Sequence, residues 1–338
     1  MEWRQEVSSS IVRLCLRRSL PVRAKVGSLN RVEVILASEF YDIVSGLLSK
    51  CAVYCSIQEA ETKVGVGEES LLESKWMKED IGGYDILAPK KEGLYHIALR
   101  GVVHGDNEVM VLSWTSDVFE VCKEDMVLEF TPKMLTCLRE FHTEESKVFR
   151  IREDYGAGMG THIYDGAVVL MRFLLMRNDA GQRREGLALE LGSGCGVLGV
   201  FLGTIYESVL LTDKGAQLPL LTRNIAENKA VSECCHSEAL DWGSSSDWLA
   251  LAEKMKTLPR LQAVYASDVL YDAEAATHLK QLLREISSLP GRDRGTREVV
   301  IAQKMRGEEA VDVPKLFKDF SPRLAMQESF VAVWCLRV

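Results

Sequence analysis

The amino-acid sequence predicts an α/β protein in its C-terminal half, preceded by a smaller α+β region. From residue 187 onward, short apolar stretches alternate with helical stretches, which is typical of a parallel sheet with helices on both faces. The first half lacks this alternation, and 338 residues are enough for two domains. We place the boundary between residues 130 and 148, with an N-terminal region at 1–140 and the α/β domain at 146–338.

The expected elements of the α/β domain follow from its apolar pattern. Helices are indicated where leucine and isoleucine recur at helical spacing, around Leu221 and around Leu282, and where Asp165 caps an apolar helix that ends near Met176. The expected strands are 187–191, 208–213, 238–242, 263–268, 299–303 and 329–338.

The first half indicates different structure. A β-hairpin is expected from strands at 95–103 and 108–114, joined by a turn at 104–107, with helical material before it. A further strand is expected at 146–154. We expect this region to be a lid or a docking surface, because it carries no recognisable site of its own.

Composition excludes some classes of protein. A net charge of −8 leaves no global basic field, so no nucleic-acid partner is expected. No apolar run reaches the roughly 18 residues that span a bilayer, so no membrane partner is expected either. The nine cysteines are odd in number and irregularly spaced, which favours reduced thiols over a disulfide framework, and neither they nor the six histidines predict a metal site.

These features favour a cytoplasmic and possibly nuclear protein, with a monomer as the expected state. The first 25 residues leave one alternative open, because their arginines and serines are similar to those of a mitochondrial transit peptide. Glu2 and Glu6 argue against that interpretation, and an exposed helix with a charged face is the other one.

The strongest motif is LELGSGCG at residues 189–196, where a strand with Glu190 near its end runs into Gly192, Ser193, Gly194 and Gly196. Glycines let the backbone approach a ligand closely, and the start of the next helix offers N–H groups to a carboxylate. A nucleotide-like ligand is therefore expected beyond the strand end.

A dinucleotide-binding loop is the rival interpretation, because Gly194, Gly196 and Gly199 also match G-x-G-x-x-G and Asp213 lies where a ribose acid would. Glu190 favours a ligand with a cationic amine, since its charge would repel a pyrophosphate. The methyl donor S-adenosyl-L-methionine carries such an amine.

Two later strand ends add candidate ligand contacts. Asp213 can accept hydrogen bonds from both ribose hydroxyls, although capping the next helix is an alternative role. Asp241 and Trp242 can reach the exocyclic amine of adenine and stack on its ring, although Trp242 could instead be a core residue.

The fourth strand of the domain ends in Ser267 and Asp268, with Tyr271 three residues later. Enzymes that methylate base amines usually have an Asn/Asp-Pro-Pro-Tyr-like segment here, and this chain lacks both prolines. Aspartate and tyrosine suit an alkylammonium group instead, because one supplies charge and the other an aromatic face.

These motifs together resemble the class I lysine methyltransferases of methyltransferase family 16, which include the methyltransferase-like 21 and 22 types. The matching segments are Tyr164 to Gly166, LELGSGCG, Asp213, Asn224, Trp242 and Asp268 to Tyr271. The resemblance covers residues 146–338, and Tyr164 departs from it because the family usually has tryptophan there.

The resemblance implies a Rossmann-like, seven-strand sheet and methyl transfer from S-adenosyl-L-methionine to a lysine of a protein substrate. A small amine, another protein side chain or a non-catalytic adaptor role are the alternatives. Asp268 would orient the amine and Tyr271 would form a wall of its pocket. The expected cofactor-binding residues are Tyr164, Glu190, Gly192, Ser193, Gly194, Gly196, Asp213, Asp241, Trp242 and Ser267.

Overall fold

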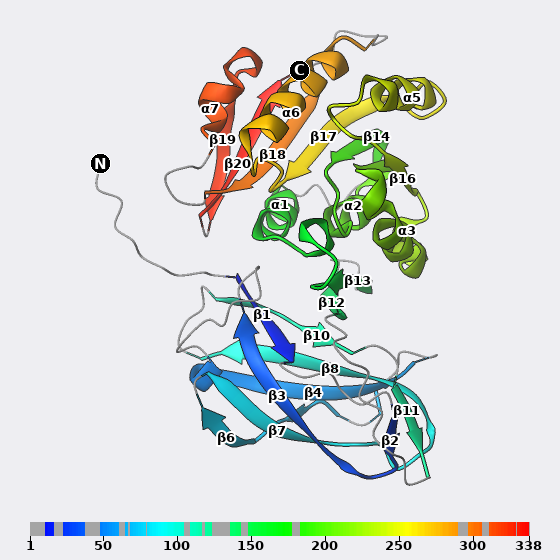
Figure 1. Ribbon diagram of the computed structural model, residues 1–338, viewed down its shortest axis with the longest axis vertical. Coiled ribbons are helices and arrows are strands. Elements are labelled where there is room, and N and C mark those ends of the chain that lie inside the picture. The colour runs from blue at the N-terminus through cyan, green and yellow to red at the C-terminus, as the bar shows by residue number, and fades with distance from the viewer. Residues whose placement is uncertain are drawn as a thin grey trace, which may run out of the picture. The chain divides into compact units, whose positions relative to one another are not determined.

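A computed structural model of the chain divides into two compact units (Figure 1). The first consists of Met1–Glu140 with Arg152–Gly158, and the second of Phe141–Ile151 with Met159–Val338. The described residues are 11–16, 23–37, 48–60, 65–66, 68–78, 80–104, 109–116, 119–123, 136–142, 148–177, 183–289, 297–305, 311–328 and 330–337.

The second unit is built on a seven-stranded sheet in the order β16-β15-β14-β17-β18-β20-β19. Its neighbouring strands run parallel except at β20, which is antiparallel to both β18 and β19. The strands are β14 (Arg184–Leu191), β15 (Tyr206–Asp213), β16 (Cys235–Ala239), β17 (Leu261–Ser267), β18 (Glu298–Lys304), β19 (Arg323–Glu328) and β20 (Val331–Arg337).

This sheet confirms the predicted α/β class, with two differences in detail. β16 begins and ends three residues before the expected strand, so Asp241 and Trp242 lie in the loop that follows it. β19 was not expected, because only half of its sequence RLAMQE is apolar and the strand is largely exposed at the edge of the sheet.

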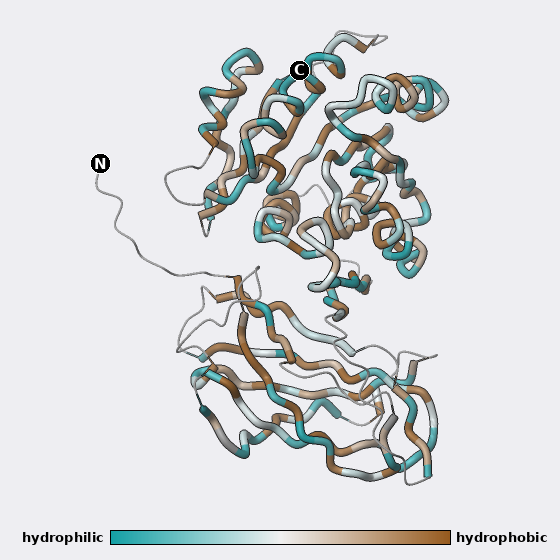
Figure 2. Tube along the Cα trace, in the orientation of Figure 1, coloured by the Kyte–Doolittle hydropathy of each residue, from teal (hydrophilic) through white to brown (hydrophobic). Residues whose placement is uncertain are grey.

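Helices pack on both faces of the sheet. α1 and α2 contact each other, α1 also contacts β18 and β20, and α2 contacts β14 and β15. The apolar side chains of α5, α6 and α7 join a core cluster with the strands, so the helices carry apolar stripes (Figure 2). The helices are α1 (Asp165–Met176), α2 (Val197–Leu202), α3 (Leu218–Glu227), α4 (Lys229–Ser232), α5 (Ser245–Met255), α6 (Ala273–Ser287) and α7 (Val313–Leu316).

The first unit differs from its prediction, because its described residues form strands and one 3-10 turn at Leu48–Lys50 where helical material was expected. One sheet has the order β6-β7-β3-β1-β9, and the other has β13-β12-β10-β8-β11-β2, with β4 pairing β5 and β8. The strands are β1 (Ile11–Leu16), β2 (Arg23–Lys25), β3 (Leu29–Ala37), β4 (Cys51–Glu59), β5 (Ser70–Leu71), β6 (Ser74–Lys78), β7 (Ile81–Leu87), β8 (Gly93–Val103), β9 (Met110–Leu112), β10 (Trp114–Thr115), β11 (Phe119–Cys122), β12 (Thr136–His142) and β13 (Val148–Asp154).

The expected hairpin and the expected N-terminal helix both differ from the strands that are present. The antiparallel pairing of the expected hairpin is present between β8 and β10, whereas β9 pairs in parallel with β1. Residues 105–107 of the expected turn lie outside the described residues. The prediction of an exposed helix in the first 25 residues is wrong for Ile11–Leu16, because these residues form β1, a fully buried strand. Residues 1–10 and 17–22 lie outside the described part.

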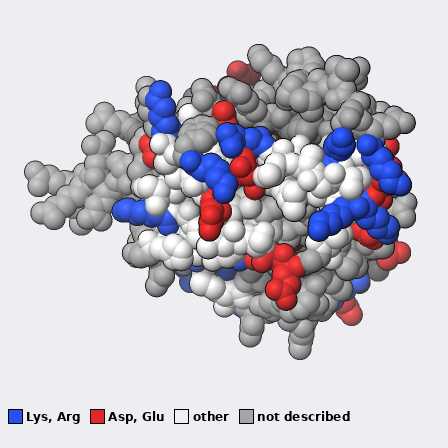
Figure 3. All heavy atoms as spheres, turned by 90° about the horizontal axis from the view of Figure 1, so that it is seen from below, with Lys and Arg blue, Asp and Glu red and all other residues white. Residues whose placement is uncertain are grey.

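The surface seen in Figure 3 carries lysine and arginine side chains interspersed with aspartate and glutamate. Exposed ion pairs of this kind in the first unit include Arg31 with Asp85 and Arg100 with Glu69. Such pairs contribute little to stability, because water and salt screen them.

A buried ion pair lies inside the first unit. Arg139 of β12 and Glu153 of β13 are both fully buried, and Nε of Arg139 lies 2.6 Å from Oε2 of Glu153. Arg139 Nη1 also donates to the Leu14 carbonyl oxygen of β1 at 2.6 Å, and Tyr155 Oη donates to Glu153 Oε2 at 3.0 Å. The pair therefore joins three strands. Replacing only one partner by an apolar side chain would leave the other charge buried without compensation.

We expect Arg139→Met to lower the free energy of unfolding by about 3–5 kcal/mol, because it leaves the Glu153 carboxylate buried without its partner. Urea denaturation measures this loss. Arg31→Met is the matched control, since the same change in an exposed pair should cost less than about 1 kcal/mol. Equal effects of the two substitutions would contradict the role assigned to the buried pair.

Candidate functional site

The candidate site lies where the strand order of the second unit reverses. β14 pairs with β15 on one side and with β17 on the other, so the chain turns outward in both directions from β14. Open parallel sheets bind their ligands beyond the C-terminal strand ends at such a point. The loop at residues 192–196 leaves β14 there and leads into α2.

The loop depends on its glycines. Gly192, Gly194 and Gly196 have φ angles of +71°, +54° and +86°, which favour glycine strongly over other residues. A Cβ on Gly194 would also lie 2.9 Å from the carbonyl oxygen of Gly160, so this glycine allows a second chain segment to approach.

The backbone amides of this loop mostly hold the loop itself. The N–H groups of Gly192 and Ser193 both donate to the Thr212 carbonyl oxygen at 2.9 Å. The Gly194 N–H donates to Asp213 Oδ2 at 2.7 Å. The expected set of free N–H groups for a carboxylate is therefore not found at these three residues, because β15 has taken them up.

Glu190 lies beneath the loop and is 1% exposed. Burial raises the pKa of its carboxyl group to about 8, while the Ser193 hydroxyl and the Gly199 N–H lower it in part. Glu190 Oε2 and Ser193 Oγ are buried without a hydrogen-bond partner of normal geometry among the described residues. Polar atoms in this state are candidates for binding a ligand.

Gly199 of α2 was not singled out as a site residue, although it makes room for Glu190. A Cβ at this position would lie 2.5 Å from Glu190 Oε2 and 2.1 Å from a methyl carbon of Leu211. The signal was present in the sequence as the third glycine of G-x-G-x-x-G.

Asp213 ends β15 beside the glycine loop. Its Oδ2 accepts from Gly194 N–H and its Oδ1 from Lys214 N–H, both at 2.7 Å. Burial raises the pKa of the carboxyl group, and the two N–H groups oppose that shift. Each carboxylate oxygen retains a second lone pair, so Asp213 can still accept hydrogen bonds from a ligand.

Trp242 lies at the same end of the sheet. It packs against the core cluster of the unit, and a Cβ on Gly192 would be 3.3 Å from its indole ring. Asp241 is half-exposed; its Oδ1 accepts from Gly243 N–H and its Oδ2 lies 3.8 Å from Lys214 Nζ. Trp242 therefore lies beside the glycine loop, whereas the described contacts of the Asp241 carboxylate are with Gly243 and Lys214.

The segment before α1 lies along the other side of the glycine loop. Tyr164 Oη donates to the Met159 carbonyl oxygen at 2.8 Å, and Cys195 Sγ donates to the His162 carbonyl oxygen at 3.4 Å. The fully buried Asn224 of α3 donates to the Cys195 carbonyl oxygen at 2.7 Å. Tyr164 is the N-cap residue of α1, one position before the expected cap.

Asp268 connects three elements after β17. Its Oδ2 accepts from the Gly166 N–H of α1 at 2.6 Å, and its Oδ1 accepts from the Lys304 N–H of β18 at 2.8 Å. Asp268 is buried and has a φ of +52°, an uncommon conformation for a non-glycine residue. A Cβ on Gly166 would lie 2.4 Å from Asp268 Oδ2, so only glycine allows this contact.

Lys304 was also missed by sequence reasoning. Its Nζ lies 2.6 Å from Oδ2 of the buried Asp165, the first residue of α1, so it holds the start of this helix from a second side. Nothing in the sequence near Lys304 marks this contact, because its partner lies 139 residues away.

The remaining predicted residues differ in exposure. Ser267, the last residue of β17, is half-buried, and Tyr271 is 55% exposed. Tyr271 can therefore contact a partner that comes from outside, whereas Asp268 is buried.

The donor set fits S-adenosyl-L-methionine. Glu190 would provide a buried carboxyl group for its ammonium group, Asp213 would provide acceptors for its ribose hydroxyls, and Trp242 would offer an aromatic face for its adenine. Among the described residues, no three histidine, cysteine, aspartate or glutamate side chains are grouped to hold a metal ion. No described helix is long and apolar enough to cross a membrane.

Comparison with known proteins identifies related chains. Protein N-lysine methyltransferase METTL21A of Danio rerio is 25% identical over 209 residues, which is 61% of this chain and 87% of that protein. The METTL21A of Mus musculus is 28% identical over 142 residues, 41% of this chain and 61% of that protein. A UPF0665 family protein of Schizosaccharomyces pombe is 26% identical over 163 residues, and the match spans 46% of each chain, less than half of that relative's length.

The solved structures are more distant. A 16S rRNA N2 G1207 methyltransferase of T. Thermophilus, in complex with AdoMet and guanosine, has a TM-score of 0.42 and 12% identity, over 79% of this chain and 57% of that one.

The family model described as lysine methyltransferase matches residues 143–318, just over half of the sequence. The chain therefore belongs to the lysine methyltransferase family.

Proposed function

We propose that this protein transfers a methyl group from S-adenosyl-L-methionine to the side-chain amine of a lysine in a protein substrate. The observation that carries the proposal is the family match, which includes the glycine loop, Asp213, Trp242 and Asp268 in one stretch of chain. Incubation with radiolabelled donor and cell extract tests it. Label on protein lysine is expected, and label on small molecules alone would overturn it.

The donor supplies an electrophilic methyl carbon on a sulfonium centre. Three residues of this chain would hold the donor: the buried Glu190, Asp213 at the end of β15 and Trp242 beside Gly192. Holding both reactants in near-attack geometry supplies much of the rate, since the displacement needs alignment above all.

Asp268 and Tyr271 define the acceptor end in this proposal. The two N–H bonds of Asp268 fix its carboxylate at the strand ends, and its remaining lone pairs can accept from an incoming amine. Tyr271 would form an aromatic wall for the alkylammonium group. Asp268 is thus a positioning residue through its backbone contacts and a catalytic residue through the amine.

The acceptor amine must lose its proton to water before it attacks. A free lysine has a pKa of about 10.4, so only a small fraction is neutral at pH 7. A desolvated pocket and a neighbouring cation both lower the pKa of an ammonium group. We assign the deprotonation to this environment and not to a strong general base.

The exposure of Tyr271 favours a protein acceptor over a small amine. Sites for small molecules usually enclose most of their ligand, whereas Tyr271 is 55% exposed among the described residues. A protein substrate would cover the ring with its own surface. The first unit, which has its own core, is then best explained as a docking surface for that substrate or as a lid.

The cellular location follows from the thiols. All nine cysteines are free, which is typical of proteins in a reducing compartment, so we infer the cytoplasm or the nucleus.

We expect donor binding at pH 7 to release about one proton, because Glu190 has a pKa of about 8 in the free protein and must ionise to hold the ammonium group. Calorimetry in buffers of different ionisation enthalpy measures the release. Affinity should fall as pH drops below 8. In Glu190→Gln the proton release should vanish, and an unchanged release would show that another group is responsible.

We expect Asp213→Ala to weaken donor binding by about 1.5–3 kcal/mol, because the ribose loses its charge-assisted hydrogen bonds. Titration calorimetry measures the change. Asp312→Ala is the matched control, since Asp312 also accepts a backbone N–H, from Lys315 at 3.0 Å, but lies at the cap of α7. Equal donor affinity in both variants would assign Asp213 a purely structural role.

We expect Asp268→Asn and Gly166→Ala both to lower kcat by about 100-fold or more, for different reasons. Asparagine keeps the shape but loses the charge and one acceptor, whereas a Cβ on Gly166 displaces the carboxylate without removing its charge. Donor affinity, measured separately, should stay close to normal. Tyr271→Phe should cost much less if the ring acts as a wall.

Thermal unfolding separates catalysis from folding in this series. If kcat fell only in proportion to the fraction of folded protein, Asp268 would be structural and the lysine assignment would lose its support at the acceptor end.

A further inference from the structure

Two adjacent cysteines lie at the start of β16, the edge strand of the second unit's sheet. Cys234 occupies the turn between α4 and β16, and Cys235 is the first residue of β16. The Cys234 carbonyl oxygen accepts from Val209 N–H at 3.0 Å, so β16 is attached to the sheet at this point. The methyl transfer proposed above uses neither thiol.

The Cys234 thiol is half-buried and lies beside a cation. Its Sγ is 3.5 Å from the carbonyl oxygens of Gly203 and Tyr206. Arg183 Nε donates to the same Tyr206 oxygen at 3.2 Å, which places the guanidinium group next to the sulfur. The Cys235 thiol and Arg183 lower the pKa of Cys234 to about 6, against the effect of burial.

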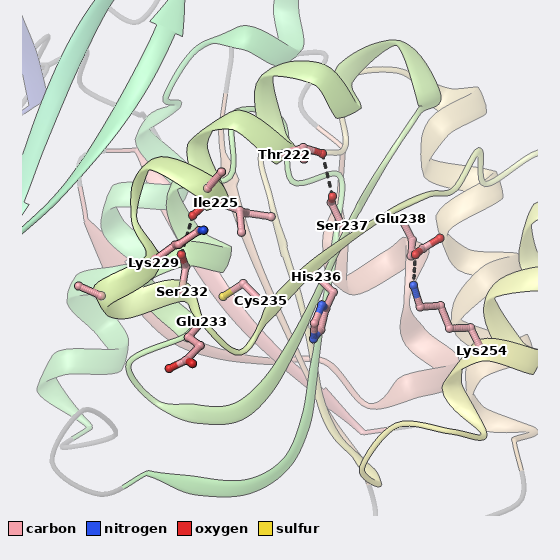
Figure 4. Close-up of a pocket in the computed structure, with 12 residues that line it drawn as sticks. Thr222, Ile225, Lys229, Ser232, Glu233, Cys235, His236, Ser237, Glu238 and Lys254 are labelled. Carbon is pink, nitrogen blue, oxygen red and sulfur yellow. Dashed lines mark hydrogen bonds and ion pairs between the residues drawn. The ribbon is translucent and has the colours of Figure 1, made fainter.

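The Cys235 thiol contacts α2, and Cys235 also lines a surface cavity. Its Sγ donates to the Gly199 carbonyl oxygen of α2 at 3.6 Å. Cys235 also lines a cavity of about 880 Å³ on the edge of the sheet, with His236 and Lys229 among its neighbours (Figure 4). Small polar molecules can therefore approach the pair from the cavity as well as from the side of Cys234.

We propose that Cys234 and Cys235 form a peroxide-sensitive dithiol that closes into a disulfide between the two neighbouring residues. The Cys234 thiolate attacks hydrogen peroxide, breaks its O–O bond and becomes a sulfenic acid, while the departing hydroxide takes a proton to form water. Cys235 then attacks the sulfenic sulfur, and its proton leaves with the hydroxyl group as a second water. Two thiols are oxidised and one peroxide is reduced.

The position of Cys235 connects this oxidation to the donor site. Cys235 Sγ contacts the carbonyl oxygen of Gly199, and a Cβ on the same Gly199 would lie 2.5 Å from Glu190 Oε2. Forming the disulfide draws the sulfur away from α2 and toward the turn. We expect donor affinity to fall by about tenfold, within the usual range for coupled sites. This second half rests on the proposed donor site.

The experiment treats the reduced full-length protein with a modest excess of hydrogen peroxide and maps the products by mass spectrometry of peptides. Wild-type protein should lose two hydrogen atoms from the peptide that contains both cysteines. Cys235→Ser should stop at a sulfenic acid on Cys234, which dimedone traps, and Cys234→Ser should react slowly. Burial raises the pKa of Cys51 to about 11 and of Cys55 to about 12, so these thiols are internal controls that should stay reduced.

The two halves of the proposal fail separately. If Cys234 reacted no faster than Cys51, or if peroxide produced no bond between the neighbours, the dithiol assignment would be overturned even if the protein methylates normally. If the bond formed and calorimetry found equal donor affinity before and after reduction, the coupling would be overturned. Donor affinity that falls on oxidation, recovers with dithiothreitol and is insensitive to peroxide in Cys234→Ser supports both halves.

Discussion

The carboxylate of Asp268 is the contact on which the arrangement of the second unit's site depends. It accepts N–H groups from α1 and from β18 while it follows β17, so it fixes the start of one helix to the ends of two strands. Only a carboxylate has two oxygens that accept in this way without offering a donor. The contact also forces a glycine at residue 166 and holds Asp268 itself in a left-handed conformation.

Much of this unit was predictable because its chemistry stands at strand ends. Glu190, Asp213 and Asp268 each follow an apolar run, and the carboxyl ends of parallel strands meet at one edge. The contacts that complete the site were predictable only in part. The third glycine of G-x-G-x-x-G marks Gly199, whereas Lys304 contacts Asp165, 139 residues away, and no local pattern marks such a contact.

The first unit was harder to predict for the same reason. Its sheets pair β1 with β9 and β2 with β11, about 100 residues apart, so their register depends on contacts that a local pattern does not contain. Short apolar runs there fit a buried strand as well as a buried helix segment, which explains why helical material was expected. The buried pair of Arg139 and Glu153 then adds specific polar contacts to a core that is largely apolar.

The donor site contains buried polar atoms that lack a hydrogen-bond partner within the described part of the chain, so ligand binding affects the stability of the fold. The loop amides bond to β15, whereas Glu190 Oε2 remains buried without a partner among the described residues. The folded pKa of Glu190 is above its ordinary value of 4.5, so its contribution to stability is present below about pH 4.5 and is lost as pH rises through about 8. A cationic ligand offsets that loss, because its positive charge stabilises the ionised carboxylate in place of the water that burial excludes. Binding of the donor therefore completes the fold as well as the site.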